Sequence, residues 1–321
     1  MKHHWKVTLI LVGMFLVAQI IGLFVVHSYN TPILVGNLTA NTVPYGMAPP
    51  PIDAAPALGS IIFSFILAVS IIFLLMKFKA AIFLRSWFFL VVCLAIGLVF
   101  NIIIVNINPV FGIKVLNIPL FHPTISELLA FVLALPISYL KVFKREMITH
   151  NLSELLIYPG ISVAFIPILN IWTVAALLVI ISAYDMYAVW HSGFMQKMAK
   201  YQINELKFFA GFFVPYLKKD DKVKLEKIKS QKLSVKGKEQ KIKGIKVHLA
   251  ILGGGDVVFP IIAAGVVLTL WGLLPALMVT IGATIALSLL LYYSEKGKFY
   301  PAMPFISAGI FLGLIAAYLI R

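Results

Sequence analysis

The chain has very few of the polar side chains that a soluble protein places on its surface. Only 12% of its 321 residues are charged, whereas 61% are hydrophobic, and the mean hydropathy is +0.99. So few charged residues cannot cover a water-facing surface, which excludes a soluble globular domain. We therefore expect an integral membrane protein.

Cysteine is nearly absent, and the common metal and nucleophile motifs do not occur. The lone Cys93 has no second cysteine with which to form a disulfide or a thiolate metal site. The seven histidines are scattered, without a His-x-x-x-His pair or a His-Glu-x-x-His motif, and there is no Gly-x-Ser-x-Gly. These absences argue against a metalloprotease and a serine hydrolase, and we predict no metal and no cofactor.

Long apolar runs dominate what is present. About 20 apolar residues in a helix cross ~30 Å of hydrocarbon. Nine such runs are predicted, at 7–26, 58–76, 84–105, 121–140, 152–168, 170–190, 247–268, 272–293 and 300–320. The first is too long for a signal peptide and lacks a small-residue cleavage site, so we expect it to be retained. The predicted fold class is an all-α membrane protein with nine transmembrane helices.

Lysine and arginine predict the orientation, because basic loops stay in the cytoplasm. With the N-terminus cytoplasmic and the C-terminus external, 25 of the 27 basic residues fall in cytoplasmic segments. The sequence then divides into helices one to six (1–190), a basic cytoplasmic loop (191–246) and helices seven to nine (247–321). We expect the cell membrane as the location.

The net charge of +15 does not indicate nucleic-acid binding. Fifteen lysines lie in 191–246, and the part from 218 onward has no aromatic residues that could stack on bases. A solvated linker attracted to anionic lipid explains it better, at about 1 kcal/mol per lysine near the surface. The part before it, 191–217, could continue the sixth helix or lie along the interface.

Four acidic residues lie in or at the ends of the predicted spans. Glu127 and Glu154 each stand three residues after a capping residue at a predicted helix start, which gives them a structural role. Asp185 and Asp256 are surrounded by apolar sequence, where a carboxylate is costly and indicates function. Both are expected in the cytoplasmic half of the bilayer, on antiparallel neighbours. Such a pair would share one proton, so that one carboxylate acts as base and the other as acid.

Three short motifs accompany the two aspartates: Tyr184-Asp185, Gly253-Gly254-Gly255-Asp256 and Pro301-Ala302-Met303. In this order and on these spans they resemble the Tyr-Asp, Gly-x-Gly-Asp and Pro-Ala-Leu signatures of the presenilin and signal peptide peptidase family of intramembrane aspartyl proteases. The resemblance implies that Asp185 and Asp256 are catalytic. It also implies that Tyr184, the three glycines and Pro301, Ala302 and Met303 shape the site.

Two details depart from the family pattern. Met303 stands where the family has leucine, a substitution of similar volume. A Pro275-Ala276-Leu277 sequence also occurs, near the external end of the eighth span, and we interpret it as a coincidence.

The resemblance implies that the substrates are transmembrane-helix polypeptides, and that accessory subunits are not required. The segment 244–249 could offer a strand edge to an unwound substrate. Two alternatives remain open, which are a proton- or ion-coupled transporter that uses the aspartate pair, and a protease of the prepilin peptidase type.

Overall fold

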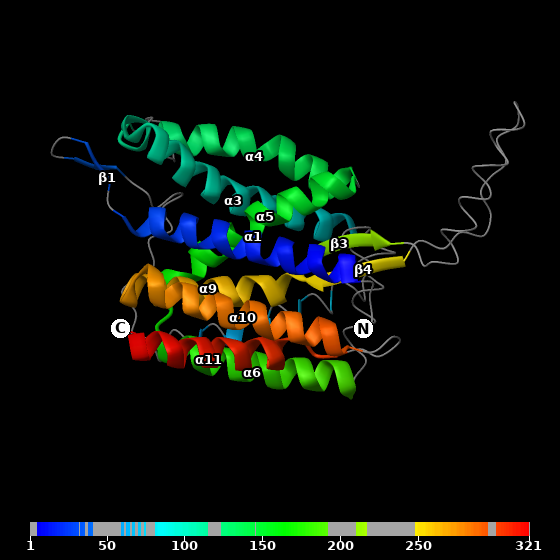
Figure 1. The fold of residues 1–321 in the computed structure, drawn as a ribbon. Coiled ribbons are helices and arrows are strands. Elements are labelled where there is room, and N and C mark those ends of the chain that lie inside the picture. The colour runs from blue at the N-terminus through cyan, green and yellow to red at the C-terminus, as the bar shows by residue number, and fades with distance from the viewer. Residues whose placement is uncertain are drawn as a thin grey trace, which may run out of the picture.

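The computed structural model describes residues 5–31, 33–35, 38–40, parts of 59–74, 81–114, 123–144, 146–191, 210–216, 248–294 and 300–320. Within them, eight helices are long and apolar enough to cross a membrane. They are α1 (Trp5–Asn30), α3 (Ala81–Ile107), α4 (Ile125–Phe143), α5 (Met147–Phe165), α6 (Ile171–Trp190), α9 (Gly254–Trp271), α10 (Leu273–Tyr293) and α11 (Met303–Ile320). They run side by side as one bundle (Figure 1).

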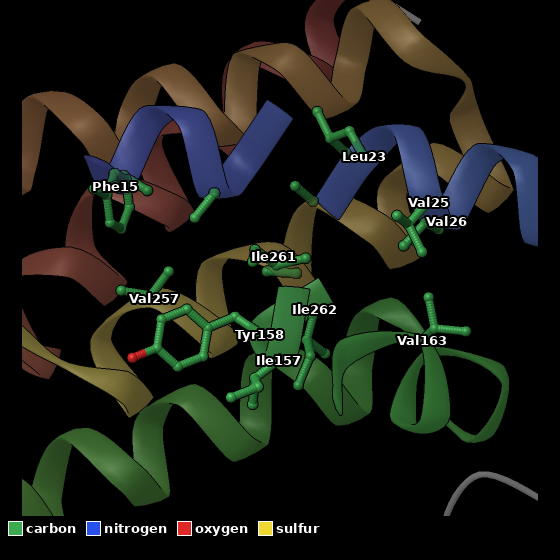
Figure 2. Close-up of a cluster of buried hydrophobic side chains, with 14 of the residues drawn as sticks. Phe15, Leu23, Val25, Val26, Ile157, Tyr158, Val163, Val257, Ile261 and Ile262 are labelled. Atoms are coloured by element: carbon green, nitrogen blue, oxygen red, sulfur yellow. The ribbon is translucent and has the colours of Figure 1, made fainter. Parts of the chain in front are cut away.

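The helix α9 lies at the centre of this bundle. It contacts α1, α5, α6, α10 and α11, and it has the highest buried share of the eight described spans. Figure 2 shows the packing of α1, α5 and α9, where Phe15, Tyr158, Val257 and Ile261 lie together. Asp256 lies in the first turn of α9, which begins with Gly254. The packing of α9 against α1 and α5 therefore fixes the position of Asp256.

Eight of the nine predicted spans match described helices. The division of 152–190 is confirmed, since α5 is followed by a short 3-10 helix, η3 (Ile166–Ile168), and α6 begins after Asn170. Asn170 and Thr173 form a reciprocal cap in which each side chain accepts from the other backbone N–H at 2.8 Å. Of the predicted span 58–76, the structure describes residues 59–60, 62–64, 66–67, 70–71 and 74, and all of these are helical.

Short connections join most of the helices. A second 3-10 helix, η2 (Pro109–Gly112), follows α3. Gly272 alone separates α9 from α10, and its φ of 91° lies in the left-handed region that favours glycine. A chain reversal this tight places α9 and α10 antiparallel and in contact.

Two antiparallel ribbons lie at opposite ends of the bundle. β1 (Ile33–Val35) pairs with β2 (Leu38–Ala40), and β3 (Gly211–Tyr216) pairs with β4 (His248–Gly253). In Figure 1 the start of α1 and the β3–β4 ribbon lie at the right, whereas β1 and the C-terminal end lie at the left. The start of α1 and the end of α11 therefore lie at opposite ends of the bundle.

The β3–β4 ribbon corrects two expectations. Residues 211–216 were expected in a helix or along the interface, but they form a strand. Phe212, Phe213 and Val214 favour strands, whereas Gly211 and Pro215 are unfavourable inside a helix. The seventh span was expected to begin at 247, but 248–253 is a strand and the helix begins at Gly254. The predicted substrate-binding strand at 244–249 overlaps β4 only at 248–249, and 244–247 lie outside the described residues.

Candidate active site

Asp185 lies near the end of α6, with only 5% of its surface exposed. Its Oδ2 accepts a hydrogen bond from the backbone N–H of Met303 at 3.0 Å, and the carboxylate also accepts one from the N–H of Ala302. The first N–H groups of a helix have no partner inside it. Asp185 therefore caps α11 from a neighbouring helix, and its position depends on the start of α11.

Asp256 lies in the first turn of α9. Gly253 is the N-cap residue, and its backbone N–H donates to the Asp256 carboxylate. An acid at the third helical position that reaches back to the N-cap is half of a capping box. The sequence argument that Asp256 lacks a structural explanation was therefore wrong, because it placed the helix start seven residues too early.

The helices α6 and α9 are in contact, and the two carboxylates lie close enough to interact electrostatically. One turn before Asp185, the hydroxyl of Ser182 donates to the hydroxyl of Ser307 on α11 at 2.9 Å. Contacts among α6, α9 and α11 thus bring together both aspartates and the segment that precedes Met303. An aspartate pair of this kind can activate water.

The segment before α11 is buried but not helical. Pro301 is buried and Ala302 partly buried, and neither belongs to α11. A proline has no N–H to satisfy, so it suits a buried segment outside regular structure. Pro275 lies in the first turn of α10, at the opposite end of the bundle from Asp185 and Asp256. The geometry therefore brings 301–303, and not 275–277, to the aspartates.

The three glycines before Asp256 differ in the room around them. A Cβ on Gly253 would lie 3.1 Å from Oδ2 of Asp256, and one on Gly254 would lie 3.1 Å from Cε1 of Tyr158. A Cβ on Gly255 would meet only the Phe259 ring, at 3.7 Å. A side chain at either of the first two positions would thus require Asp256 or Tyr158 to move by a few tenths of an ångström, and the third position is exposed.

Tyr184 is partly buried beside Asp185 and interacts with its carboxylate electrostatically. Within the described part of the chain, no group of three or more His, Cys, Asp or Glu side chains could hold a metal ion. A cavity of about 300 Å³ lies between the end of α10 and the start of α11. Neither aspartate lines this cavity, so it is not the centre of the site.

The ribbon that leads into Asp256 offers a backbone edge. The N–H and C=O of Phe213 on β3 bond to the Asn151 side chain and thus point away from β4. In an antiparallel pair, two opposite residues either both point their N–H and C=O groups at the other strand or both point them away from it. Ile251, which pairs with Phe213, therefore directs its own N–H and C=O away from β3, as does Leu249 two residues earlier. This edge of β4 ends three residues before Asp256.

Several residues near the site were missed by the sequence analysis. Glu154 was expected to cap a helix start at 151, but α5 begins at Met147, so Glu154 lies two turns inside it. There it is 1% exposed and forms a buried salt bridge with Lys141 of α4. The Lys141 ammonium, counted among the cytoplasmic loop charges, is therefore buried in the last turn of α4. The Glu127 cap is confirmed, as half of a capping box with Thr124.

Gln19 on α1 was also missed. Its side-chain amide donates to the backbone C=O of Val257 at 3.0 Å, and the residue is fully buried. A lone glutamine in a 26-residue apolar helix is a signal that could have indicated this role. It fixes the first turn of α9 to α1.

The comparisons establish the fold. No family model matches the chain, and no curated protein matches it. Two solved structures of a presenilin family intramembrane aspartate protease do match, each at 18% identity and with a TM-score of 0.58. The one in space group C222 covers 98% of this chain and 99% of its own, and the one in P2 covers 97% of each. The expected fold, a presenilin-like all-α membrane protein, is confirmed.

Proposed function

We propose that this protein is an intramembrane aspartic endopeptidase, which hydrolyses peptide bonds within or near the transmembrane segments of other proteins. The observation that carries the proposal is the pairing of Asp185 and Asp256 where α6, α9 and α11 meet. The two solved structures with this fold, both of a presenilin family intramembrane aspartate protease, support it.

The mechanism follows from one proton shared by two carboxylates. The ionised aspartate removes a proton from water, and the resulting hydroxide attacks the peptide carbonyl carbon. The protonated aspartate donates its proton to the carbonyl oxygen, which gives a tetrahedral diol. The C–N bond then breaks as the amine leaving group takes up a proton from the pair, and a free carboxyl and a free amine remain. Either aspartate can begin as the base.

The other predicted site residues act around this pair. Ala302 and Met303 donate the two N–H groups that fix the Asp185 carboxylate. Tyr184 packs beside Asp185, and Pro301 keeps the approach to α11 free of helical structure. Gly253 and Gly254 leave room for Asp256 and Tyr158, and the exposed Gly255 leaves room for the backbone of a bound peptide.

The substrate class follows from the edge of β4 that pairs with no strand among the described residues. A helix cannot be hydrolysed until it unwinds, because its carbonyls are hydrogen-bonded and shielded by side chains. An unwound segment can add to β4 as a strand, bonding to the backbone of Leu249 and Ile251. That addition would bring its next residues towards Asp256. Transmembrane helices that unwind readily are therefore the proposed substrates.

The protein is proposed to reside in the cell membrane without accessory subunits, with its N-terminus cytoplasmic. The basic loop at 191–246 would separate the two catalytic halves, 1–190 and 247–321, and would face anionic lipid.

The test of the proposal is the loss of cleavage in amide variants. Asp185→Asn and Asp256→Asn should each abolish cleavage of single-span peptides, because an amide can neither share the proton nor act as a base. The measurement is product identification by mass, with the purified protein in detergent or lipid. Glu146→Gln is the matched control, because Glu146 is an exposed acid at the start of α5. It should cleave at the parent rate. Cleavage by either folded aspartate variant would overturn the assignment.

A further inference from the structure

One face of α5 holds the β3–β4 ribbon. Asn151, Glu154 and Tyr158 follow at intervals of three and four residues, which places them on the same side of the helix. Each contacts the ribbon or the glycine that follows it. This face lies outside the three motifs that accompany the aspartates.

Asn151 substitutes for a third strand. Its Oδ1 accepts from the N–H of Phe213 at 3.0 Å, and its Nδ2 donates to the C=O of the same residue at 2.8 Å. This is the pair of bonds that a neighbouring strand would make. The outer edge of β3 is thereby occupied, and a substrate strand is left with the edge of β4.

Glu154 and His150 hold the beginning of the same strand. The Glu154 carboxylate accepts from the N–H of Gly211 at 3.2 Å, and Nε2 of His150 lies 2.8 Å from the C=O of Gly211. Lys141 pairs with Glu154 and lies 3.0 Å from Nδ1 of His150. A buried ion pair contributes little to net stability, but it fixes geometry when its hydrogen bonds are satisfied.

Tyr158 extends this contact to the active-site helix. Its ring meets Phe212 of β3 edge to face, with centroids 5.3 Å apart. On its other side it lies against Gly254, and Figure 2 shows it beside Val257. The α5 face therefore contacts both β3 and the first turn of α9, which carries Asp256.

We propose that Asn151 and Glu154 are positioning residues, which fix the ribbon so that a strand added to β4 presents one particular peptide bond to the aspartates. The inference rests on the proposed protease function. The Asp256 carboxylate is hydrogen-bonded to Gly253, the last residue of β4. A shift of the ribbon therefore changes which peptide bond of an added substrate strand lies at this carboxylate. A variant with a loosened ribbon should cleave the substrate at several neighbouring peptide bonds, and each of these bonds more slowly.

The test compares Asn151→Leu, which keeps the volume and removes both bonds, with Ser153→Ala. Ser153 lies between the two positioning residues, and among the described residues its hydroxyl bonds within α5, to the C=O of His150. Products of one single-span peptide are identified by mass, and kcat and KM are measured separately. Asn151→Leu should lower kcat about tenfold and spread cleavage over adjacent bonds, whereas Ser153→Ala should keep the parent rate and position. Unchanged positions and kcat in Asn151→Leu would overturn the proposal.

Amide hydrogen exchange gives a second measurement that does not require cleavage. Asn151→Leu should increase exchange about tenfold in 211–216 and 248–253, and Ser153→Ala should not. If the parent cleaves no peptide, the protease proposal fails, and the exchange result alone decides whether α5 holds the ribbon. Asn151→Asp keeps the acceptor for Phe213 N–H, and its exchange should lie between those of the parent and the leucine variant. It replaces the leucine variant if that one does not fold.

Discussion

At the scale of single residues, the site depends on backbone groups as much as on side chains. Asp185 is fixed by two N–H groups at the start of α11, and Asp256 by one at the end of β4. Both carboxylates accept hydrogen bonds where helices begin, and negative charge is favourable there. Small changes in these backbones should therefore alter activity before they alter folding.

The glycines allow this to be tested. Gly253→Ala places a methyl group 3.1 Å from Oδ2 of Asp256, which must displace the carboxylate. We expect kcat to fall at least about tenfold, because misplacement of a catalytic group by a fraction of an ångström is costly. Gly255→Ala meets only ordinary contacts and should retain a thermal midpoint within about 2 °C of the parent. The measurements are kcat and thermal unfolding in detergent. A fully active Gly253→Ala would refute this reading of the first turn.

At the scale of elements, close helix packing holds α11 in place. A Cβ on Gly282 of α10 would lie 2.2 Å from the backbone oxygen of Gly309 on α11. Small residues allow membrane helices to approach this closely. Lipid is as apolar as the helix surfaces, so close van der Waals packing, and not the hydrophobic effect, holds the two helices together. Since Asp185 is hydrogen-bonded to the start of α11, the close packing of α10 on α11 also fixes the position of Asp185.

Gly282→Ala should therefore force α10 and α11 apart. We expect a loss of about 1–3 kcal/mol in stability and a lower cleavage rate, measured by thermal unfolding and peptide turnover. Gly13→Ala on α1 is the matched control, because nothing lies within 4 Å of its Cβ position. It should be neutral or slightly stabilising. Equal thermal midpoints in the two variants would contradict the close contact.

At the scale of the whole molecule, the β3–β4 ribbon and the start of α1 share one end of the bundle (Figure 1). Asp256 lies at the same end, because α9 begins directly after β4, and Asp185 interacts with it. The distribution of lysine and arginine predicts that this end is cytoplasmic. Exposed positions lie at both ends, with His191 after α6 at this end and Thr31 after α1 at the other.

Labelling of single cysteines in intact cells tests this topology. In a Cys93→Ala background, an impermeant reagent should modify Thr31→Cys from outside, and it should modify His191→Cys only after permeabilisation. Cys93 is buried in α3, so its removal serves only to lower the background. Modification of both positions from the same side would overturn the topology, and the reverse pattern would invert the predicted orientation.

Most of the architecture could be predicted from the sequence, because the bilayer imposes it directly. A run of about 20 apolar residues has no stable alternative to a spanning helix, so eight spans were predicted close to their observed positions. A lone acid such as Asp185 in such a run is costly enough to be noticed, and its partner Asp256 was found in the same way. The motifs around them predicted which segments would meet.

The polar contacts between elements were decided only by tertiary structure. Glu154 was misassigned because its sequence neighbours suggest a cap, whereas its actual partners, Lys141 and Gly211, lie 13 and 57 residues away. The strands β3 and β4 are too short to be recognised by periodicity, and β3 is held by Asn151 of α5, 62 residues away from Phe213. Such contacts satisfy backbone groups that a membrane cannot solvate, and which side chain does so depends on how the helices pack.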